Sequence, residues 1–335
     1  MAFTSCYEED TLTPTEGGVE LRFKVPQGNN SWDNDIAQIY EDYNVYLIYK
    51  DLQRADFNRS WTGIAYGSGY EGQGCVNDEM ANYYVEFMKK HIFAYLNPPI
   101  TSKVLPMYWY LGYNVYSKSV LEVGGVILAS WIVPIHENYD GLDYWCTCMF
   151  GEDNPSDPYL IPTDRALLDR RRKMILAPVL EKAVKAGNII IPEEFEMGFD
   201  HVTNLIAGLG MEDDPNYYLT RGYPGSVNTY VFNSTSTPAN NSYPPTNEET
   251  FIGYMHLSMY YNQTRLAEVY PADKYPFLTE KFAFVQKYLK DKYQIDLEAI
   301  ANGPEDWDLP LPPIPETPDA VSYTHLRAHE TVLDL

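Results

Sequence analysis

The residues of this sequence best suited to chemistry are a histidine–glutamate pair and a few isolated histidines. His136 and Glu137 begin an H-E-x-x pattern that ends at Asp140 rather than at a second histidine. On a helix, two histidines four residues apart can bind one zinc ion while the glutamate acts as general base. Here Pro134 closes an apolar run just before the motif, and Asp140 is followed by glycine, which is typical of a turn. The pattern therefore predicts a loop after a strand.

A glycine-rich segment offers a second candidate motif. Residues 67–72 read GSGYEG, which matches G-x-G-x-x-G and precedes an expected helix. A dinucleotide-binding loop needs a buried strand leading directly into its first glycine. The segment before the first glycine is short and mixes polar with apolar residues. In addition, Glu71, Asp78 and Glu79 would place negative charge against a pyrophosphate. We therefore reject dinucleotide binding and expect a mobile loop.

Composition limits the partners of the chain. Its 335 residues carry a net charge of −23, which argues against nucleic acid and against binding anionic lipid by charge. The basic cluster at 170–173 is predicted to be a solvated helix face. No run approaches the roughly 20 apolar residues of a membrane span. Four cysteines are too few for a disulfide scaffold, and the spacing of Cys146 and Cys148 favours two strand residues on one face over a zinc knuckle.

The C-terminal residues have the sequence of a translated sequencing adapter. Residues 321–331 read VSYTHLRAHET, and we interpret Val321 to Leu335 as a read-through artefact. Excluding it removes His325 and His329, whose i, i+4 spacing imitates a pair of metal ligands. It leaves 23 basic and 45 acidic residues and a net charge of −22.

Cys6 has a context that predicts lipidation. The residues Ala2-Phe3-Thr4-Ser5 before Cys6 are similar to the end of a bacterial lipoprotein signal, whose remainder would lie upstream of Met1. The acidic residues that follow resemble the export signal of surface lipoproteins of the Bacteroidetes. A linker of Thr, Pro and Gly at residues 11–18 then leads to the domain. An ordinary N-terminus with a stray cysteine is the alternative.

Periodicity and capping signals predict an α+β fold, with a mixed sheet and helices in the N-terminal half and mainly helices in the C-terminal half. Residues 212–246 are expected to form a long polar loop. We divide the chain into a signal remnant and linker (1–18), one domain (19–302), a Pro-rich acidic tail (303–320) and the artefact (321–335). The expected strands are Val19–Val25, Asn44–Tyr49, Val104–Leu111 and Val123–Ile135, and the expected helices are Trp32–Tyr43, Asn77–Leu96, Asp164–Met174, Pro178–Gly187, Glu248–Tyr261 and Thr279–Tyr293.

Three segments carry a resemblance to a known family. Tyr40–Tyr49 is similar to a helix-to-strand junction of the zinc-binding metallopeptidase lipoproteins of Bacteroidetes, Arg221–Ser226 resembles their "GF-x-x-PYA" stretch, and Lys281–Leu297 resembles their terminal helix. The order of features agrees from about residue 30 to 300. The resemblance implies a gluzincin-like scaffold, which is a metallopeptidase fold whose zinc-binding motif lies on a helix.

The same resemblance implies that the zinc ligands have been lost. Counting back from Pro192 and Phe195 places the family's H-E-x-x-H on residues 179–183, so that Val179 and Ala183 replace the histidines and Leu180 replaces the glutamate. The position of the third ligand falls on Gly253. None of these side chains can bind zinc, whereas a hydrolytic zinc site needs three protein ligands and an open position for water.

The sequence thus predicts a surface-anchored lipoprotein with a catalytically inactive metallopeptidase-like domain. We expect no cofactor, a peptide, protein or glycan ligand at the cell surface, and a role at an outer-membrane nutrient-uptake system. One alternative is an active zinc metallopeptidase with non-standard ligands; another is a structural or adhesive surface subunit. The pocket residues that could support a relocated metal site are Asp200, His201, Glu249 and His256.

Overall fold

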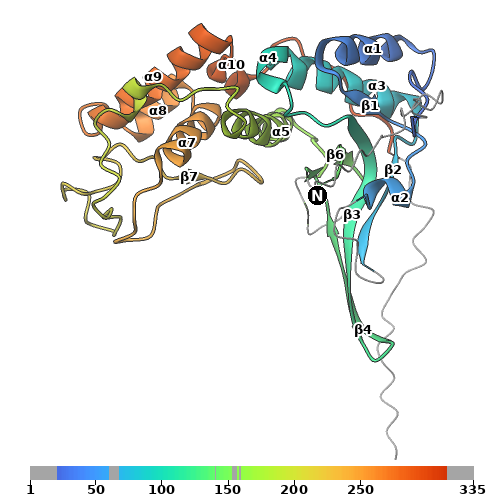
Figure 1. The fold of residues 1–335 in the computed structure, drawn as a ribbon, viewed down its shortest axis with the longest axis horizontal. Helices are drawn as coiled ribbons and strands as arrows, with labels where there is room; N and C mark the ends of the chain where they lie inside the picture. The colour runs from blue at the N-terminus through green and yellow to red at the C-terminus, as the bar shows by residue number, and fades with distance from the viewer. Residues whose placement is uncertain (1–20, 60–67, 140, 153–156, 158–159, 315–335) are drawn as a thin grey trace, which may run out of the picture.

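The computed structural model describes residues 21–59, 68–139, 141–152, 157 and 160–314. They form an α+β fold, as predicted, with the sheet in the N-terminal half and mainly helices in the C-terminal half (Figure 1). In Figure 1 the sheet and the first helices lie on the right, the last helices lie on the left, and α5 lies between them. Cys6, the expected linker at residues 11–18 and the residues interpreted as an artefact, 321–335, lie outside the described residues.

The sheet is mixed and is built around the long strand β3. Strands β1 and β6 pair with β3 in parallel, β2 and β4 pair with it antiparallel, and β5 pairs antiparallel with β6 at the sheet edge. Alternate residues of β3 enter two different cores, since Trp109 packs with the helices and Tyr110 packs on the opposite face. The strands are β1 (Tyr46–Ile48), β2 (Gly69–Gly74), β3 (Tyr108–Val123), β4 (Val126–Pro134), β5 (Glu137–Asn138) and β6 (Tyr144–Phe150).

Short helices cover both faces of this sheet, because Phe57 shares a core with Tyr110, whereas Ile36, Met80 and Ile100 share the other core with Trp109. The side chain of Asn77 caps α3 by accepting a hydrogen bond from the backbone N–H of Met80, as the sequence predicted. The buried Ile36 and Ile39 fix α1 against the core at helical spacing. These helices are α1 (Ser31–Tyr43), α2 (Arg54–Phe57), α3 (Asp78–Phe87) with a π turn (Met88–Ile92) and a 3₁₀ turn (Phe93–Tyr95), and α4 (Pro98–Thr101).

The second half of the chain packs around α5. Helix α5 contacts α7 and α10 on one side and α4 on the other, so it joins the helical half to the sheet. Residues 212–246 are largely loop, as predicted, with two short strands. The elements are α5 (Arg165–Lys185), α6 (Glu193–Glu196), β7 (Ser226–Val227), β8 (Thr235–Ser236), α7 (Asn247–Tyr260), α8 (Gln263–Val269), α9 (Pro276–Tyr293) and α10 (Leu297–Asn302).

Two predictions were wrong near the start of the chain, one of a strand and one of a loop. Residues 21–25 form no strand; instead Phe23 is buried and Arg22 forms an ion pair with Asp56 at 2.7 Å. The expected glycine-rich loop is largely strand β2, because Gly69–Gly74 pairs with β3. A side chain at Gly74 would collide with the backbone of Tyr49 and Lys50, so the glycine permits this close strand approach.

Other features agree with the predictions or extend them. Cys146 and Cys148 lie on β6 and, with Cys75, are free thiols. Residues 303–314 contain no helix or strand and pack on the domain, where Trp307 contacts the rings of Tyr83 and His91. No helix in the described part of the chain has the length and apolar content of a membrane span.

Candidate functional site

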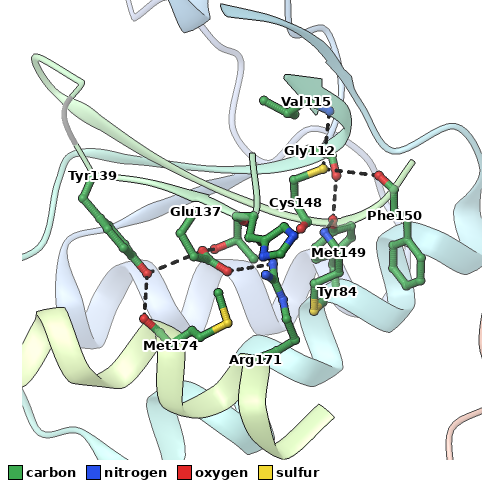
Figure 2. Close-up of polar contacts among 12 residues, drawn as sticks. Tyr84, Gly112, Val115, Glu137, Tyr139, Cys148, Met149, Phe150, Arg171 and Met174 are labelled. Carbon is green, nitrogen blue, oxygen red and sulfur yellow. Dashed lines mark hydrogen bonds and ion pairs between the residues drawn. The ribbon is translucent and has the colours of Figure 1, made fainter. Parts of the chain in front are cut away.

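The H-E-x-x motif contributes to a buried ion pair between the sheet and α5. Glu137 lies on β5, and its Oε1 is 2.7 Å from Nη2 of Arg171 on α5 (Figure 2). Its Oε2 accepts a hydrogen bond of 2.6 Å from the hydroxyl of Thr147. Only 7% of the Glu137 side chain and 1% of the Arg171 side chain are exposed. Burial raises the pKa of Glu137 to about 7, although the nearby guanidinium opposes this shift.

His136, which is also buried, adjoins this cluster. Its Nε2 lies 2.7 Å from Oδ2 of Asp157, and its ring stacks on Tyr230 with 5.4 Å between ring centroids. The residues lie just before and at the start of β5 rather than in a longer loop, which refines the prediction made from Pro134. Asp140 lies outside the described residues.

The prediction of a solvated basic helix face was wrong. Arg171 and Arg172 are 1% and 0% exposed. Arg171 donates to the backbone carbonyls of His136 and Cys148, while Arg172 donates to the carbonyl of Ile300 and pairs with Asp169 at 2.6 Å. A guanidinium carries five N–H donors, so it can satisfy several carbonyls that meet in the interior.

The predicted break before Pro178 was also wrong, because α5 runs through it as one helix. Proline cannot donate a hydrogen bond to the carbonyl four residues earlier, which here belongs to Met174. The hydroxyl of Tyr139 lies 3.4 Å from that carbonyl oxygen and 3.5 Å from Oε2 of Glu137, so it can donate to the carbonyl in place of the missing N–H (Figure 2). The buried neighbours Ala177 and Val179 hold both sides of the turn in the core.

A cleft lies where α5 and α7 come together. Its volume is about 720 Å³, and its walls combine prolines of the 224–245 loop with polar and apolar side chains of the two helices. A second cavity of about 220 Å³ adjoins the same face of α5 beside β5, and Glu181 lines both. The residues of the larger cleft used below are Glu181, Lys185, Glu248, Glu249, Gly253 and His256.

The structure places the residues that the resemblance aligns with the zinc motif in two environments. Val179, Leu180 and Ala183 are each 0% exposed and pack in the core, and none of them lines either cavity. The face of α5 that borders the cavities carries Ala177, Pro178, Glu181 and Lys185 instead.

Of the four residues that the resemblance aligns with the zinc motif, Gly253 lines the cleft. A Cβ added to this glycine would meet only the ring of Pro224, at 3.8 Å. The position therefore has room for a longer side chain that projects from α7 toward α5.

His256 is the candidate pocket residue closest to a second ligand-type side chain. Its Nε2 lies 4.0 Å from Oε2 of Glu181, and the imidazole is 11% exposed. Burial lowers the pKa of His256 to about 4, although Glu181 opposes the shift, so the ring is neutral at pH 7. Glu181 also pairs with Nζ of Lys185 at 2.6 Å. A neutral imidazole and a carboxylate thus face the cleft together.

The other three candidates have structural partners. Glu249 forms a capping box at the start of α7, where its Oε2 accepts from the backbone N–H and the hydroxyl of Thr246. Those hydrogen bonds lower the pKa of Glu249. Asp200 accepts from the backbone N–H groups of residues 202 and 203, and His201 bonds the carbonyl of Pro245 through Nδ1. Asp200 and His201 do not line the cleft.

The metal-binding capacity of this cleft is limited. His256 and Glu181 can supply two ligands, whereas a hydrolytic zinc site takes three from the protein. In the described ranges no group of three or more His, Cys, Asp or Glu side chains has an arrangement suited to a metal ion. Sequence reasoning missed Glu181 and the Glu137–Arg171 pair.

Comparisons with known proteins returned one structural similarity. No protein-family model matches the chain, and no curated protein matches it. A solved structure described as a "putative zinc-binding metallo-peptidase" from Bacteroides caccae aligns with 82% of this chain and 92% of its own, at 12% identity and a TM-score of 0.34.

Proposed function

We propose that the chain is a binding protein whose domain has the architecture of a zinc metallopeptidase and performs no hydrolysis. The observation that carries the proposal is the surface where α5 and α7 meet. At this surface Ala177, Pro178 and Gly253 offer no metal ligand, and among the carboxylates and histidines that line the two cavities Glu181 and His256 face each other, at 4.0 Å. Helix α5, which carries residues 179–183, packs against α7, which carries Gly253, and this contact also supports the proposal.

The ligand that fits the cleft best is an extended peptide. Strand β5 is the last strand of the sheet path β1-β3-β6-β5 and lies beside the smaller cavity, so a peptide can add to its backbone edge. The larger cleft presents Glu181, Glu248 and Glu249 against one lysine, Lys185. This excess of carboxylates favours a peptide with basic side chains. A glycan ligand is the competing possibility.

Peptide binding tests the proposal directly. Extended peptides with and without lysine and arginine are titrated calorimetrically into the full chain. We expect basic peptides to bind, and Gly253→Leu to weaken binding by occupying part of the cleft. Leu209→Ala serves as the control, because Leu209 is fully exposed and lies outside the cleft lining. If no peptide binds, or if Gly253→Leu binds as well as the parent, the peptide proposal is wrong.

Metal analysis separates this function from the active-enzyme alternative. The full chain is equilibrated with zinc, desalted and measured by mass spectrometry of the metal. We expect far less than about one zinc per chain, because two ligands hold zinc weakly. Stoichiometric zinc that is lost in His256→Ala would favour the alternative, an active metallopeptidase with non-standard ligands.

We propose further that the protein is held at the bacterial outer membrane by a lipid on Cys6, facing outward as part of a nutrient-uptake system. The acidic residues that follow Cys6 support this location. Mass spectrometry of the N-terminal peptide from host membranes should find Cys6 with a diacylglyceryl group. Recovery of the protein from the soluble fraction with an unmodified thiol would contradict it.

A further inference from the structure

Strands β3 and β4 form a hairpin that projects away from the rest of the molecule (Figure 1). Their pairing runs from Tyr116↔Pro134 to Val123↔Val126, and Gly124 and Gly125 form the turn with positive φ angles. Strand β2 accompanies β3 only as far as Lys118. Beyond that residue the described part of the hairpin consists of two strands, which is marginal for a ribbon in water.

The projecting part of the hairpin is apolar on both faces. Neighbouring residues of a strand point to opposite faces. Consecutive apolar residues such as Ile127 and Leu128 are both exposed here, so apolar side chains lie on both faces. Residues 119–133 contain one charged side chain, Glu122, and β4 contains none. The exposed apolar side chains are Leu121, Val123, Val126, Ile127, Leu128, Trp131, Ile132 and Val133, each 46–62% exposed.

We propose that β4 pairs along its outer edge with β4 of a second copy of this chain. In the described residues β4 pairs with β3 alone, so its other edge presents backbone N–H and C=O groups for pairing. A long, uncharged, apolar edge strand is the feature that most favours strand addition. Antiparallel pairing about a two-fold axis joins the two hairpins into a four-stranded ribbon.

The exposed apolar area of the hairpin is large. Its eight exposed side chains present on the order of 800 Å² over the two faces, and pairing along β4 covers the share of this area that lies beside that edge. The net charge of −23 opposes close approach of two whole molecules, but the hairpin carries only one charge in residues 119–133. Contact through the projecting hairpins therefore joins two copies while their acidic bodies stay apart.

A lipid bilayer is a poorer partner for this hairpin. Lipid tails cannot hydrogen-bond to the open backbone edge of a two-stranded ribbon. Glu122 lies one residue from the end of β3, so insertion of the turn would bury its carboxylate deepest. A protein strand satisfies the backbone edge and leaves Glu122 in water.

The oligomeric state of the full chain tests this proposal. Sedimentation velocity at up to about 100 μM is measured on the chain with Cys6→Ser, which removes the lipid and the disulfide route at that residue. We expect a dimer. The double variant Leu128→Lys with Ile132→Lys should weaken dimerisation about tenfold or more, because it places four lysines in one ribbon. The control is Val202→Lys with Leu209→Lys, since both residues are exposed and lie outside the hairpin.

A second measurement keeps the test valid if the lysine variant folds poorly. In the same background, Ser130→Cys on β4 should form an intermolecular disulfide under mild oxidation, whereas Val202→Cys should not. A monomer at the highest concentration would overturn the proposal, as would a control that dissociates as strongly as the β4 variant. Flotation of a monomer with phosphatidylcholine vesicles, abolished by the β4 lysines, would overturn it in favour of a membrane partner.

Discussion

Oε1 of Glu137 lies 2.7 Å from Nη2 of Arg171, and both side chains are almost completely buried. This contact joins the edge strand β5 to the middle of α5, and Arg171 also binds the carbonyls of His136 and Cys148. The two cavities lie along the same helix, one beside β5 and the other beside α7. The ion pair therefore sets the position of the sheet edge relative to the cleft.

Replacing Arg171 should destabilise the fold strongly. In Arg171→Met the Glu137 carboxylate stays buried without a cation, so we expect a loss of about 3–5 kcal/mol at pH 8 in urea unfolding. At pH 5.5 the loss should be smaller, because the raised pKa of Glu137, about 7, lets the folded state hold a neutral carboxyl. Arg265→Met, at an exposed ion pair, should remain close to the parent. Equal losses at both pH values would contradict this role for Glu137.

The hydroxyl of Tyr139 should be coupled to Pro178. Tyr139→Phe leaves the carbonyl of Met174 without its donor, which costs about 1–2 kcal/mol. In a Pro178→Ala background the new backbone N–H donates to the same carbonyl, so the cost of Tyr139→Phe should fall. A double-mutant cycle of urea unfolding measures the difference. Additive effects of the two changes would show that the hydroxyl does not replace the proline's missing donor.

Adding a methyl group at Gly253 should stabilise the chain. The added Cβ meets only Pro224, at 3.8 Å, and alanine favours a helix over glycine by about 0.5–1 kcal/mol. The midpoint of urea unfolding should rise accordingly in Gly253→Ala. The contrasting variant is Gly74→Ala, whose Cβ would lie 2.9 Å from the Cα of Lys50, and we expect it to lose about 1–3 kcal/mol. A destabilised Gly253→Ala would mean that the cleft has no room at this position.

The sequence predicted those elements whose signals are local, which means that the capping residue or the apolar spacing lies within a few residues along the chain. Helix α3 was found from its Asn77 cap and α1 from the spacing of Ile36 and Ile39. Strand β2 was missed because its glycine-rich sequence does not favour a strand by itself. It forms a strand by pairing with β3, which is distant in sequence. The continuity of α5 could not be predicted, since the donor that compensates for Pro178 comes from Tyr139 on another segment.

The site shows the same limit, with one signal that was present in the sequence. Leu168, Arg171, Arg172 and Ile175 fall at i, i+3, i+4 and i+7, so the two arginines occupy the apolar stripe of α5. That spacing indicated burial, whereas counting charges suggested a solvated face. The approach of Glu181 to His256 has no such signal, because it depends on how α5 packs on α7.

His256 should make the fold sensitive to acid. Its folded-state pKa is lowered to about 4, whereas the unfolded chain titrates near 6.5, so the unfolded state binds more protons between these values. The stability contributed by the neutral imidazole is therefore complete above about pH 6.5 and is lost as the pH falls toward 4, by up to about 3 kcal/mol. His256→Gln removes this titration, so its free energy of unfolding should fall less than that of the parent between pH 7 and pH 4 in urea experiments.

The difference between the two proteins isolates His256 from Glu137, whose raised pKa acts with the opposite sign because its folded state gains a proton as the pH falls below about 7. Parallel pH profiles for the parent and His256→Gln would show that the imidazole is not held neutral in the cleft.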